Sequence, residues 1–209
     1  MAIAIHEEEL FYGEKMNDEL VSLEDREFLL KLARRCMERR VKGLAVGETQ
    51  LDGLSPKLSQ NGASFVTLTK GGKLRGCIGT LEAFQPLVLD VCEHAVAAAL
   101  EDYRFPPVDV DEINQIEIEI SYLTTPEKLE YSDSEDLLKK LHPFKDGVVL
   151  RDGSRRATFL PQVWEQLPDR EDFLSHLCSK MNAVPDLWKK KHLDVSIYRV
   201  ESFSEKELR

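Results

Sequence analysis

Apolar positions recur at helical spacing after Ser22 and predict an amphipathic helix that ends near Gly43. Ser22 and Asp25 have the spacing of a capping box at the start of this helix. A second helix is expected from Pro86 to about Asp102. Because this second helix is apolar nearly all round, we expect it to be buried on more than one side.

Runs rich in β-branched and aromatic residues predict strands between and after these helices. The expected strands, four of them in two hairpins, are 64–69 with 73–79, 116–123, 147–151 with 155–160, and 193–200. The first hairpin turns on Gly-Gly and the second on Asp-Gly. A further short helix should follow a capping box of Ser132 and Glu135, and another should follow Asp169. The tight turns favour antiparallel pairing, so we predict an α+β fold with a mostly antiparallel sheet and packed helices.

The composition is that of a globular protein. The chain has 209 residues, of which 42% are hydrophobic, and this is enough for one domain of above-average size. Residues 1–20 are acidic and weakly periodic, so we expect a poorly anchored N-terminal tail before a domain at 21–209. No apolar run is long enough to span a membrane and the N-terminus does not resemble a secretory signal, so a cytoplasmic protein is expected.

The overall charge is strongly negative, at 28 − 38 = −10. Since neutralisation of phosphates supplies most nonspecific affinity for nucleic acid, this charge disfavours a nucleic-acid binder. Two short basic runs, Arg155–Arg156 and Lys189–Lys191, nevertheless keep that function open as the least favoured alternative.

Four cysteines stand at positions 36, 77, 92 and 178, and no two of them form a C-x-x-C pair. This spacing argues against a zinc ribbon and against a disulfide. The histidines show no ligand spacing either, so neither a metal nor a cofactor is expected. Cys36, Cys92 and Cys178 lie on apolar helix faces and are interpreted as packing residues.

The densest candidate chemistry is the segment Leu74-Arg75-Gly76-Cys77-Ile78-Gly79. On a regular strand Arg75 and Cys77 share one face, about 7 Å apart, while the two apolar residues face the core. A nearby cation favours the thiolate, and glycines at 76 and 79 allow a ligand or another backbone to approach. Cys77 is therefore a candidate nucleophile; the alternative is a small buried hydrophobe beside a bulge.

Four other polar residues are candidates. Glu119 and Ser121 lie on the polar face of the expected strand 116–123, where Glu119 could pair with an arginine or act as a base. A solvated sheet face is the simpler interpretation of both. Asp102 and Arg104 follow the apolar helix and could line a cleft, or form a surface ion pair of little energetic value.

Several segments, in order, resemble the AMMECR domain family, whose prokaryotic members are called AmmeMemoRadiSam system protein A. The most specific is the motif at 74–79, and the agreement continues at 97–105, 118–123 and 157–164. The resemblance extends over roughly residues 20–209. It implies an α+β fold with a larger and a smaller lobe, and a cleft near the motif.

The resemblance supplies no established reaction. It implies a modification pathway shared with a radical S-adenosylmethionine enzyme and a Memo-type protein. One departure from the family pattern is Tyr103, where a small residue or proline is expected. The positions that match the family's segments are Arg75, Gly76, Cys77, Gly79, Asp102, Arg104, Glu119 and Ser121.

Three functions stay open, in this order. The first is a noncatalytic module that docks a partner or a small anionic ligand through Arg75 and Arg104. The second is an enzyme, or an enzyme subunit, with Cys77 as nucleophile and Glu119 as its base. The third is nucleic-acid binding.

Overall fold

The computed structural model describes residues 21–47 and 51–207, and the expected tail at 1–20 lies outside these ranges. The chain divides into two units. The first, larger unit runs to Thr124 and resumes at Glu201, and the second is formed by 125–200. The predicted α+β class with a larger and a smaller lobe is confirmed. No helix in the described part of the chain is long and apolar enough to cross a membrane.

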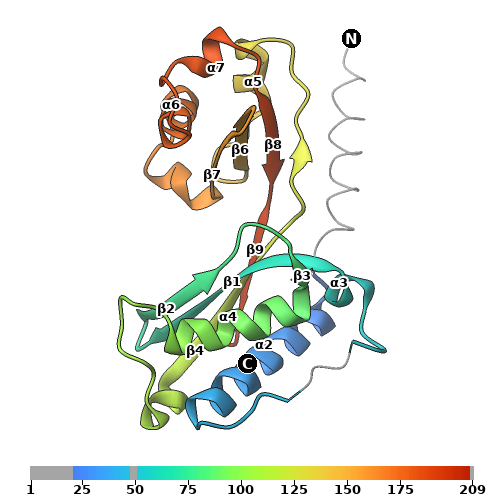
Figure 1. Cartoon of the computed structure of the whole chain (residues 1–209), viewed down its shortest axis with the longest axis vertical. Coiled ribbons are helices and arrows are strands. Elements are labelled where there is room, and N and C mark those ends of the chain that lie inside the picture. Colours follow the sequence, from blue (N-terminus) through green and yellow to red (C-terminus); the bar gives the residue numbers. More distant parts are fainter. Residues whose placement is uncertain (1–20, 48–50, 208–209) are drawn as a thin grey trace. The chain divides into compact units, whose positions relative to one another are not determined.

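The first unit contains a five-stranded sheet in the order β2-β1-β4-β9, with β3 paired to β1. The helices α2 and α4 pack against each other and against this sheet (Figure 1). Its elements are α2 (Leu23–Val41), α3 (Pro56–Ser59), β1 (Asn61–Lys70), β2 (Lys73–Gly79), β3 (Gln85–Pro86), α4 (Leu87–Leu100), a 3-10 helix (Val110–Gln115), β4 (Ile116–Leu123) and β9 (Val200–Ser204).

Helix caps, turn residues and the apolar pattern in the sequence predicted several of these elements correctly. The side chain of Ser22 accepts a hydrogen bond from the backbone N–H of Asp25, as a capping residue does. The hairpin β1–β2 turns at Gly71 and Gly72, whose φ angles of 56° and 75° explain why glycine is needed there. The helix α4 is buried on several sides, as expected from its composition.

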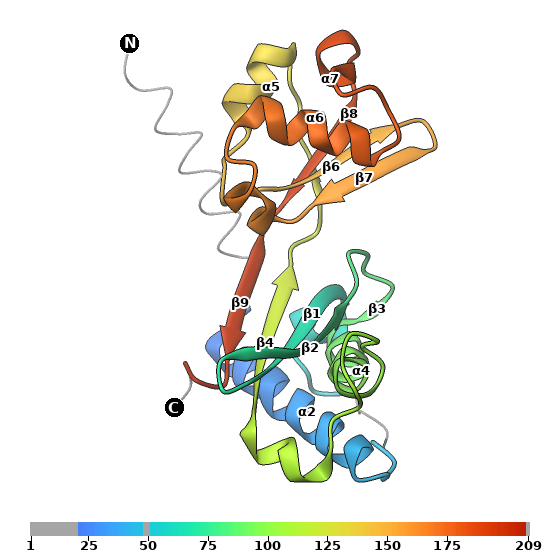
Figure 2. The ribbon, with the colours of Figure 1, turned by 90° about the vertical axis from the view of Figure 1, so that its left-hand side faces the viewer.

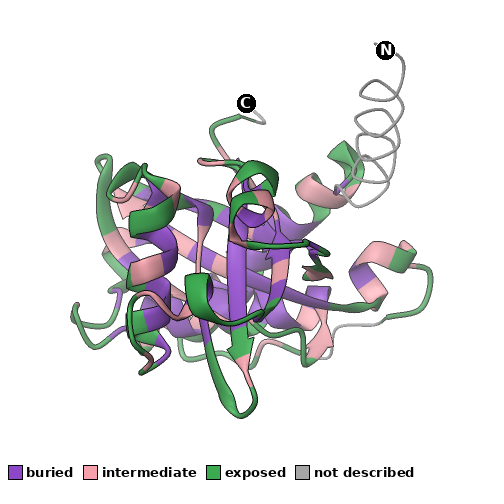
Figure 3. Cartoon of the chain, turned by 90° about the horizontal axis from the view of Figure 1, so that it is seen from above, coloured by how far each residue is buried: buried purple, intermediate pink, exposed green. Residues whose placement is uncertain are grey.

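Alternation along β4 gives the first sheet two different faces. Ile116, Ile118 and Ile120 are buried against the helices. Figure 3 colours such buried residues purple and exposed ones green. Glu119 and Ser121 lie on the opposite side. We call that opposite side, which faces away from α2 and α4, the open face.

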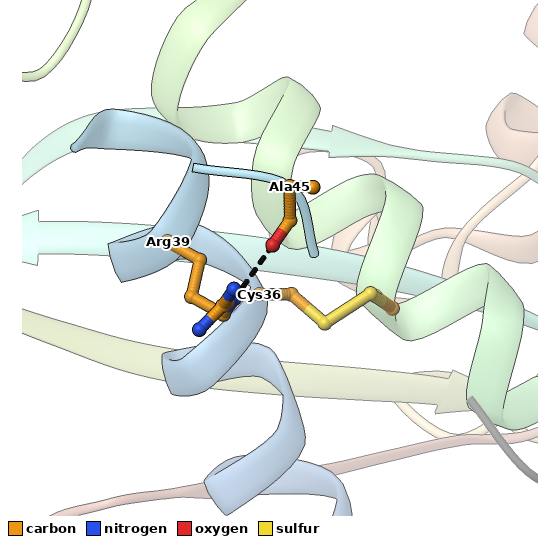
Figure 4. Close-up of a disulfide and its surroundings, with 4 residues drawn as sticks. Cys36, Arg39 and Ala45 are labelled. Carbon is orange, nitrogen blue, oxygen red and sulfur yellow. Dashed lines mark hydrogen bonds between the residues drawn. A yellow bond between two sulfur atoms is a disulfide. The ribbon is translucent and has the colours of Figure 1, made fainter. Parts of the chain in front are cut away.

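A disulfide joins Cys36 of α2 to Cys92 of α4 (Figure 4). The expectation that the chain has no disulfide was therefore wrong, and so was the interpretation of these two cysteines as packing residues alone. The two residues are 56 positions apart, so no short motif marks them, yet the packing of the helices brings their Cα atoms to 5.6 Å. Beyond the disulfide, Arg39 Nε donates to the carbonyl oxygen of Ala45 at 2.6 Å and fixes the chain that leaves α2 (Figure 4).

The second unit contains a four-stranded sheet in the order β5-β8-β6-β7. Its core includes Trp164 stacked on Phe173 and the fully buried Cys178, whose predicted packing role is confirmed. The cap of α5 is Asp133 rather than the predicted Ser132. The elements are β5 (Glu127–Lys128), α5 (Ser134–Lys140), β6 (Gly147–Asp152), β7 (Arg155–Phe159), a 3-10 helix (Pro161–Glu165), α6 (Arg170–Lys180), α7 (Leu187–Lys190) and β8 (Asp194–Tyr198) (Figure 2).

The expected last strand, 193–200, is in fact two strands. β8 ends at Tyr198 and belongs to the second sheet, whereas β9 begins at Val200 and belongs to the first. Arg199 stands between them and forms an ion pair with the buried Asp146, at 2.6 Å. The local pattern stays extended across this boundary, so it does not show that the chain changes sheets.

Candidate functional site around Cys77

Cys77 lies on β2, at one edge of the first sheet. The strand register pairs Cys77 with Thr67 of β1, and pairs Thr67 with Glu119 of β4. These three side chains therefore form one row on the open face, which we call the thiol row. Within the row, Thr67 Oγ1 donates a hydrogen bond to Cys77 Sγ at 3.3 Å.

Glu119 shares the face of Cys77 but does not contact it. Two strand spacings of about 4.8 Å place their Cα atoms roughly 10 Å apart. Glu119 is exposed, and no hydrogen bond joins it to the thiol in the described part of the chain. Ser121 lies in the neighbouring row, where its hydroxyl oxygen is 2.9 Å from that of Ser202.

The two glycines of the motif make room for the protein itself. A Cβ on Gly76 would lie 2.1 Å from the carbonyl oxygen of Ala98, because α4 packs directly on the backbone of β2. A Cβ on Gly79 would lie 2.4 Å from the ring of Phe65. We expected these glycines to admit either a ligand or another segment of the protein. In the structure they admit another segment of the protein.

Asp102 and Arg104 occupy the free edge of β2 at Cys77. The N–H of Cys77 donates to Asp102 Oδ2 at 2.8 Å, and Arg104 Nη2 donates to the carbonyl oxygen of Cys77 at 3.2 Å. Arg104 also donates to Asp102 through Nε at 2.9 Å and Nη2 at 2.6 Å. Both edge groups of Cys77 thus have partners without a neighbouring strand, which fixes its backbone and protects the edge.

The pair is electrostatically tight. Hydrogen bonding to Arg104 holds the pKa of Asp102 far below its ordinary value, although burial of the carboxylate opposes this, and the same bond raises the pKa of Arg104. Asp102 is therefore a permanent anion with a structural role rather than a general acid. The Arg104 side chain is 45% exposed, and its Nη1 has no hydrogen-bond partner among residues 21–47 and 51–207.

Arg75 does not have the position that a regular strand predicts. The register changes between Thr69, which pairs with Leu74, and Leu68, which pairs with Gly76, so Arg75 is the extra residue of a β-bulge. The expectation that Leu74 faces the core was wrong for the same reason. Leu74 shares the face of Thr69 and is 45% exposed.

The guanidinium of Arg75 makes three hydrogen bonds with the chain around 106–112. It donates to the carbonyl oxygens of Pro106 and Pro107 at 2.9 and 3.2 Å, and to Glu112 Oε2 at 2.8 Å. This interaction, with that of Lys70, lowers the pKa of Glu112 from 4.5 to about 2. The cation that contacts Cys77 is therefore Arg104 and not Arg75.

Sequence reasoning missed Thr67 and Glu112. Thr67 could be found only from the correct hairpin register, and Glu112 lies 37 positions from Arg75. Among the described ranges, no group of three or more His, Cys, Asp or Glu gathers as metal ligands would.

The fold and the motif define an α+β protein of two units that presents one free thiol on a sheet face. The AMMECR1 family profile matches residues 30–203, and the chain belongs to this family. It is 37% identical to a Methanopyrus kandleri protein, over 90% of this chain and 92% of the other, and 38% identical to a Methanosarcina barkeri protein, over 85% and 89%. A crystal structure of an uncharacterized protein from Pyrococcus horikoshii has a TM-score of 0.67 and 34% identity, over 86% of this chain and 91% of the other.

Proposed function

We propose that this AMMECR1-family protein is a cytoplasmic binding component that holds a small anionic ligand over the thiol row. The main support for this proposal is that the side chains of Asp102 and Arg104 fix the backbone of Cys77, while its thiol stays on the open face. The half-exposed guanidinium of Arg104 supplies the positive group for the ligand. Thr67 and Glu119 extend the polar surface along the row.

Cys77 offers a direct test, because it is the one cysteine of the four that is both free and partly exposed. Cys36 and Cys92 are in the disulfide, and Cys178 is fully buried, which raises the pKa of its thiol. Native alkylation with iodoacetamide therefore reports on Cys77 alone. A panel of small carboxylates, sulfonates and phosphates should contain compounds that protect it.

Protection should weaken in an Arg104→Ala variant and persist in an Arg35→Ala variant, which removes an arginine from the same unit. If no compound in the panel protects Cys77, or if both variants lose protection equally, the binding proposal is wrong. Circular dichroism of each variant confirms that it is folded.

A nucleophilic role for Cys77 is a second candidate, supported by the hydrogen bond that Thr67 donates to the sulfur. This hydroxyl positions the sulfur on the open face, where a substrate would meet it. We expect a Thr67→Val variant to be alkylated more slowly than the wild type near pH 7. A pH midpoint of alkylation at or above about 8.5, the ordinary value for cysteine, would refute the activated thiol.

We also propose that the protein acts together with a radical S-adenosylmethionine enzyme and a Memo-type protein, as the family resemblance suggests. Tyr103 departs from the family pattern, so it supports a protein contact that is particular to this chain: it is 95% exposed and lies between Asp102 and Arg104 in the sequence. Tyr103→Ala should weaken co-purification with a partner, whereas Phe144→Ala, an exposed aromatic of the second unit, should not. Equal recovery with both variants would argue against this contact.

Nucleic-acid binding gains no support from the basic runs. Arg155 and Lys191 both pair with Asp152, and Lys189 pairs with Glu171 at 2.6 Å. These carboxylates neutralise much of the charge that phosphate contacts need.

A further inference from the structure

An open hollow of about 840 Å³ lies at the turn end of the β1–β2 hairpin, in the first unit. We propose that this hollow binds a small molecule that carries a phosphate group. Its lining includes four cationic side chains and a single carboxylate, on a chain whose net charge is −10. The charged lining residues are Lys70, Lys73, Arg75, Lys206 and Glu117.

The local charge matches a dianion. Lys206 pairs with Glu117 at 2.8 Å, and Lys70 and Arg75 share Glu112, which lies behind the lining. Four cations against these two carboxylates leave 4 − 2 = +2. A phosphate monoester carries nearly two negative charges at neutral pH and offers three acceptor oxygens, so it complements both the charge and the donors.

The lysines of the lining have N–H groups available to bind a phosphate. Each lysine ammonium has three N–H groups, and Lys70 and Lys206 each have one carboxylate partner. Lys73 has no hydrogen-bond or ion-pair partner within residues 21–47 and 51–207. Its ammonium group is therefore available without the loss of an internal contact.

The hollow is held in place at Arg75 and is partly apolar. Arg75 is fixed by three hydrogen bonds and its side chain is only 12% exposed, so this charge does not need ordering when a ligand binds. The rim at Gly71 and Gly72 carries no side chains, and a Cβ at either would meet nothing within 4 Å. Leu74, which the bulge turns outward, supplies an apolar wall.

These features favour a small molecule over an acidic peptide. The volume lies in the range of about 300–1,000 Å³ that is typical of small-molecule sites. A phosphate at the cations and an uncharged body against Leu74 would use both parts of the lining. The hollow shares no residue with the thiol row, so this inference is independent of the function proposed above.

Phenyl phosphate is a suitable probe, because it joins a phosphate to a small apolar body. Calorimetric titration of the full chain at about 150 mM salt should show saturable binding at one site. Lys73→Ala and Lys206→Ala should each weaken binding by about fivefold, the upper range for an exposed charge pair. Lys73→Glu should abolish it.

Lys42→Ala is the matched control, because it removes a half-exposed lysine from the same unit, and binding should be unchanged. Cys77→Ser should also bind normally, which separates the hollow from the thiol row. Absence of saturable binding, an equal loss in Lys42→Ala, or tighter binding of a glutamate-rich peptide than of phenyl phosphate would each overturn the proposal. Thermal unfolding confirms that the variants are folded.

Discussion

Reduction of the Cys36–Cys92 disulfide should strongly destabilise the first unit. The link closes a loop across 56 positions, and such a constraint removes about 14 cal/mol/K of entropy from the unfolded chain. At 25 °C this corresponds to about 4 kcal/mol of stability. A loss of this size is a large part of the roughly 5–15 kcal/mol that stabilises a typical domain.

Urea unfolding with and without a phosphine reductant measures this difference. Both tryptophans, Trp164 and Trp188, lie in the second unit, so far-UV circular dichroism is the better probe of the first. With a slope of about 2–3 kcal/mol/M, the midpoint should fall by roughly 1.3–2 M urea on reduction. In a Cys36→Ala/Cys92→Ala variant the reductant should have no effect, which separates the link from the loss of buried sulfur.

A thiol titration in denaturant without reductant should find two free thiols in the wild type, those of Cys77 and Cys178. Four thiols, or a midpoint shift below about 0.5 M, would refute the reasoning. Because disulfides are rare in most cytosols, the same titration on protein prepared from cells with a thiol-blocking reagent tests the cytoplasmic location proposed above.

Gly76→Ala should lower the free energy of unfolding by about 1–3 kcal/mol in the same urea assay, because its Cβ would lie 2.1 Å from the carbonyl oxygen of Ala98. An unchanged free energy of unfolding would mean that α4 shifts to admit the methyl group without cost. The pKa of Glu112 falls from 4.5 to about 2 in the folded protein, so its stabilising effect is complete above pH 4.5 and is lost as the pH falls towards 2. The wild type should therefore lose stability more steeply over this interval than Glu112→Gln, and parallel pH curves would contradict this. Asp102→Ala removes the acceptor of the Cys77 N–H, so hydrogen exchange at that amide should accelerate by at least about tenfold, and an unchanged rate would mean that another group protects it.

The position of Cys77 shows why the elements were predictable and the site was not. An unbroken hairpin that starts from the observed pair Lys70–Lys73 would place Cys77 opposite Val66, which is fully buried against the helices. The bulge moves its partner to Thr67 and brings the thiol to the open face. Contacts of Arg75 with residues more than 30 positions away accompany the bulge, and no local pattern encodes such contacts.

The other wrong predictions have the same cause, because local sequence patterns do not encode contacts between distant segments. Helical and strand periodicity, Gly-Gly and Asp-Gly turns and capping residues are local, and they placed most of the helices and strands correctly. The disulfide between Cys36 and Cys92, and the change of sheet at Arg199, depend on which distant segments meet. Side chains such as Asp102 and Arg104 were found as candidates, but their contacts with the backbone of Cys77 required the fold.

The return of the chain to the first unit at Glu201 affects the order in which the protein can assemble. Phe203 is buried in the first core, and Arg34 of α2 pairs with Glu205. A ribosome delivers the segment that begins at Glu201 only after the whole of 125–200 has been made. The second unit is continuous in sequence and can complete its core first, whereas the first unit, although begun earlier, must wait for β9. Of the two units, the one that carries Cys77 is therefore finished after the other during synthesis.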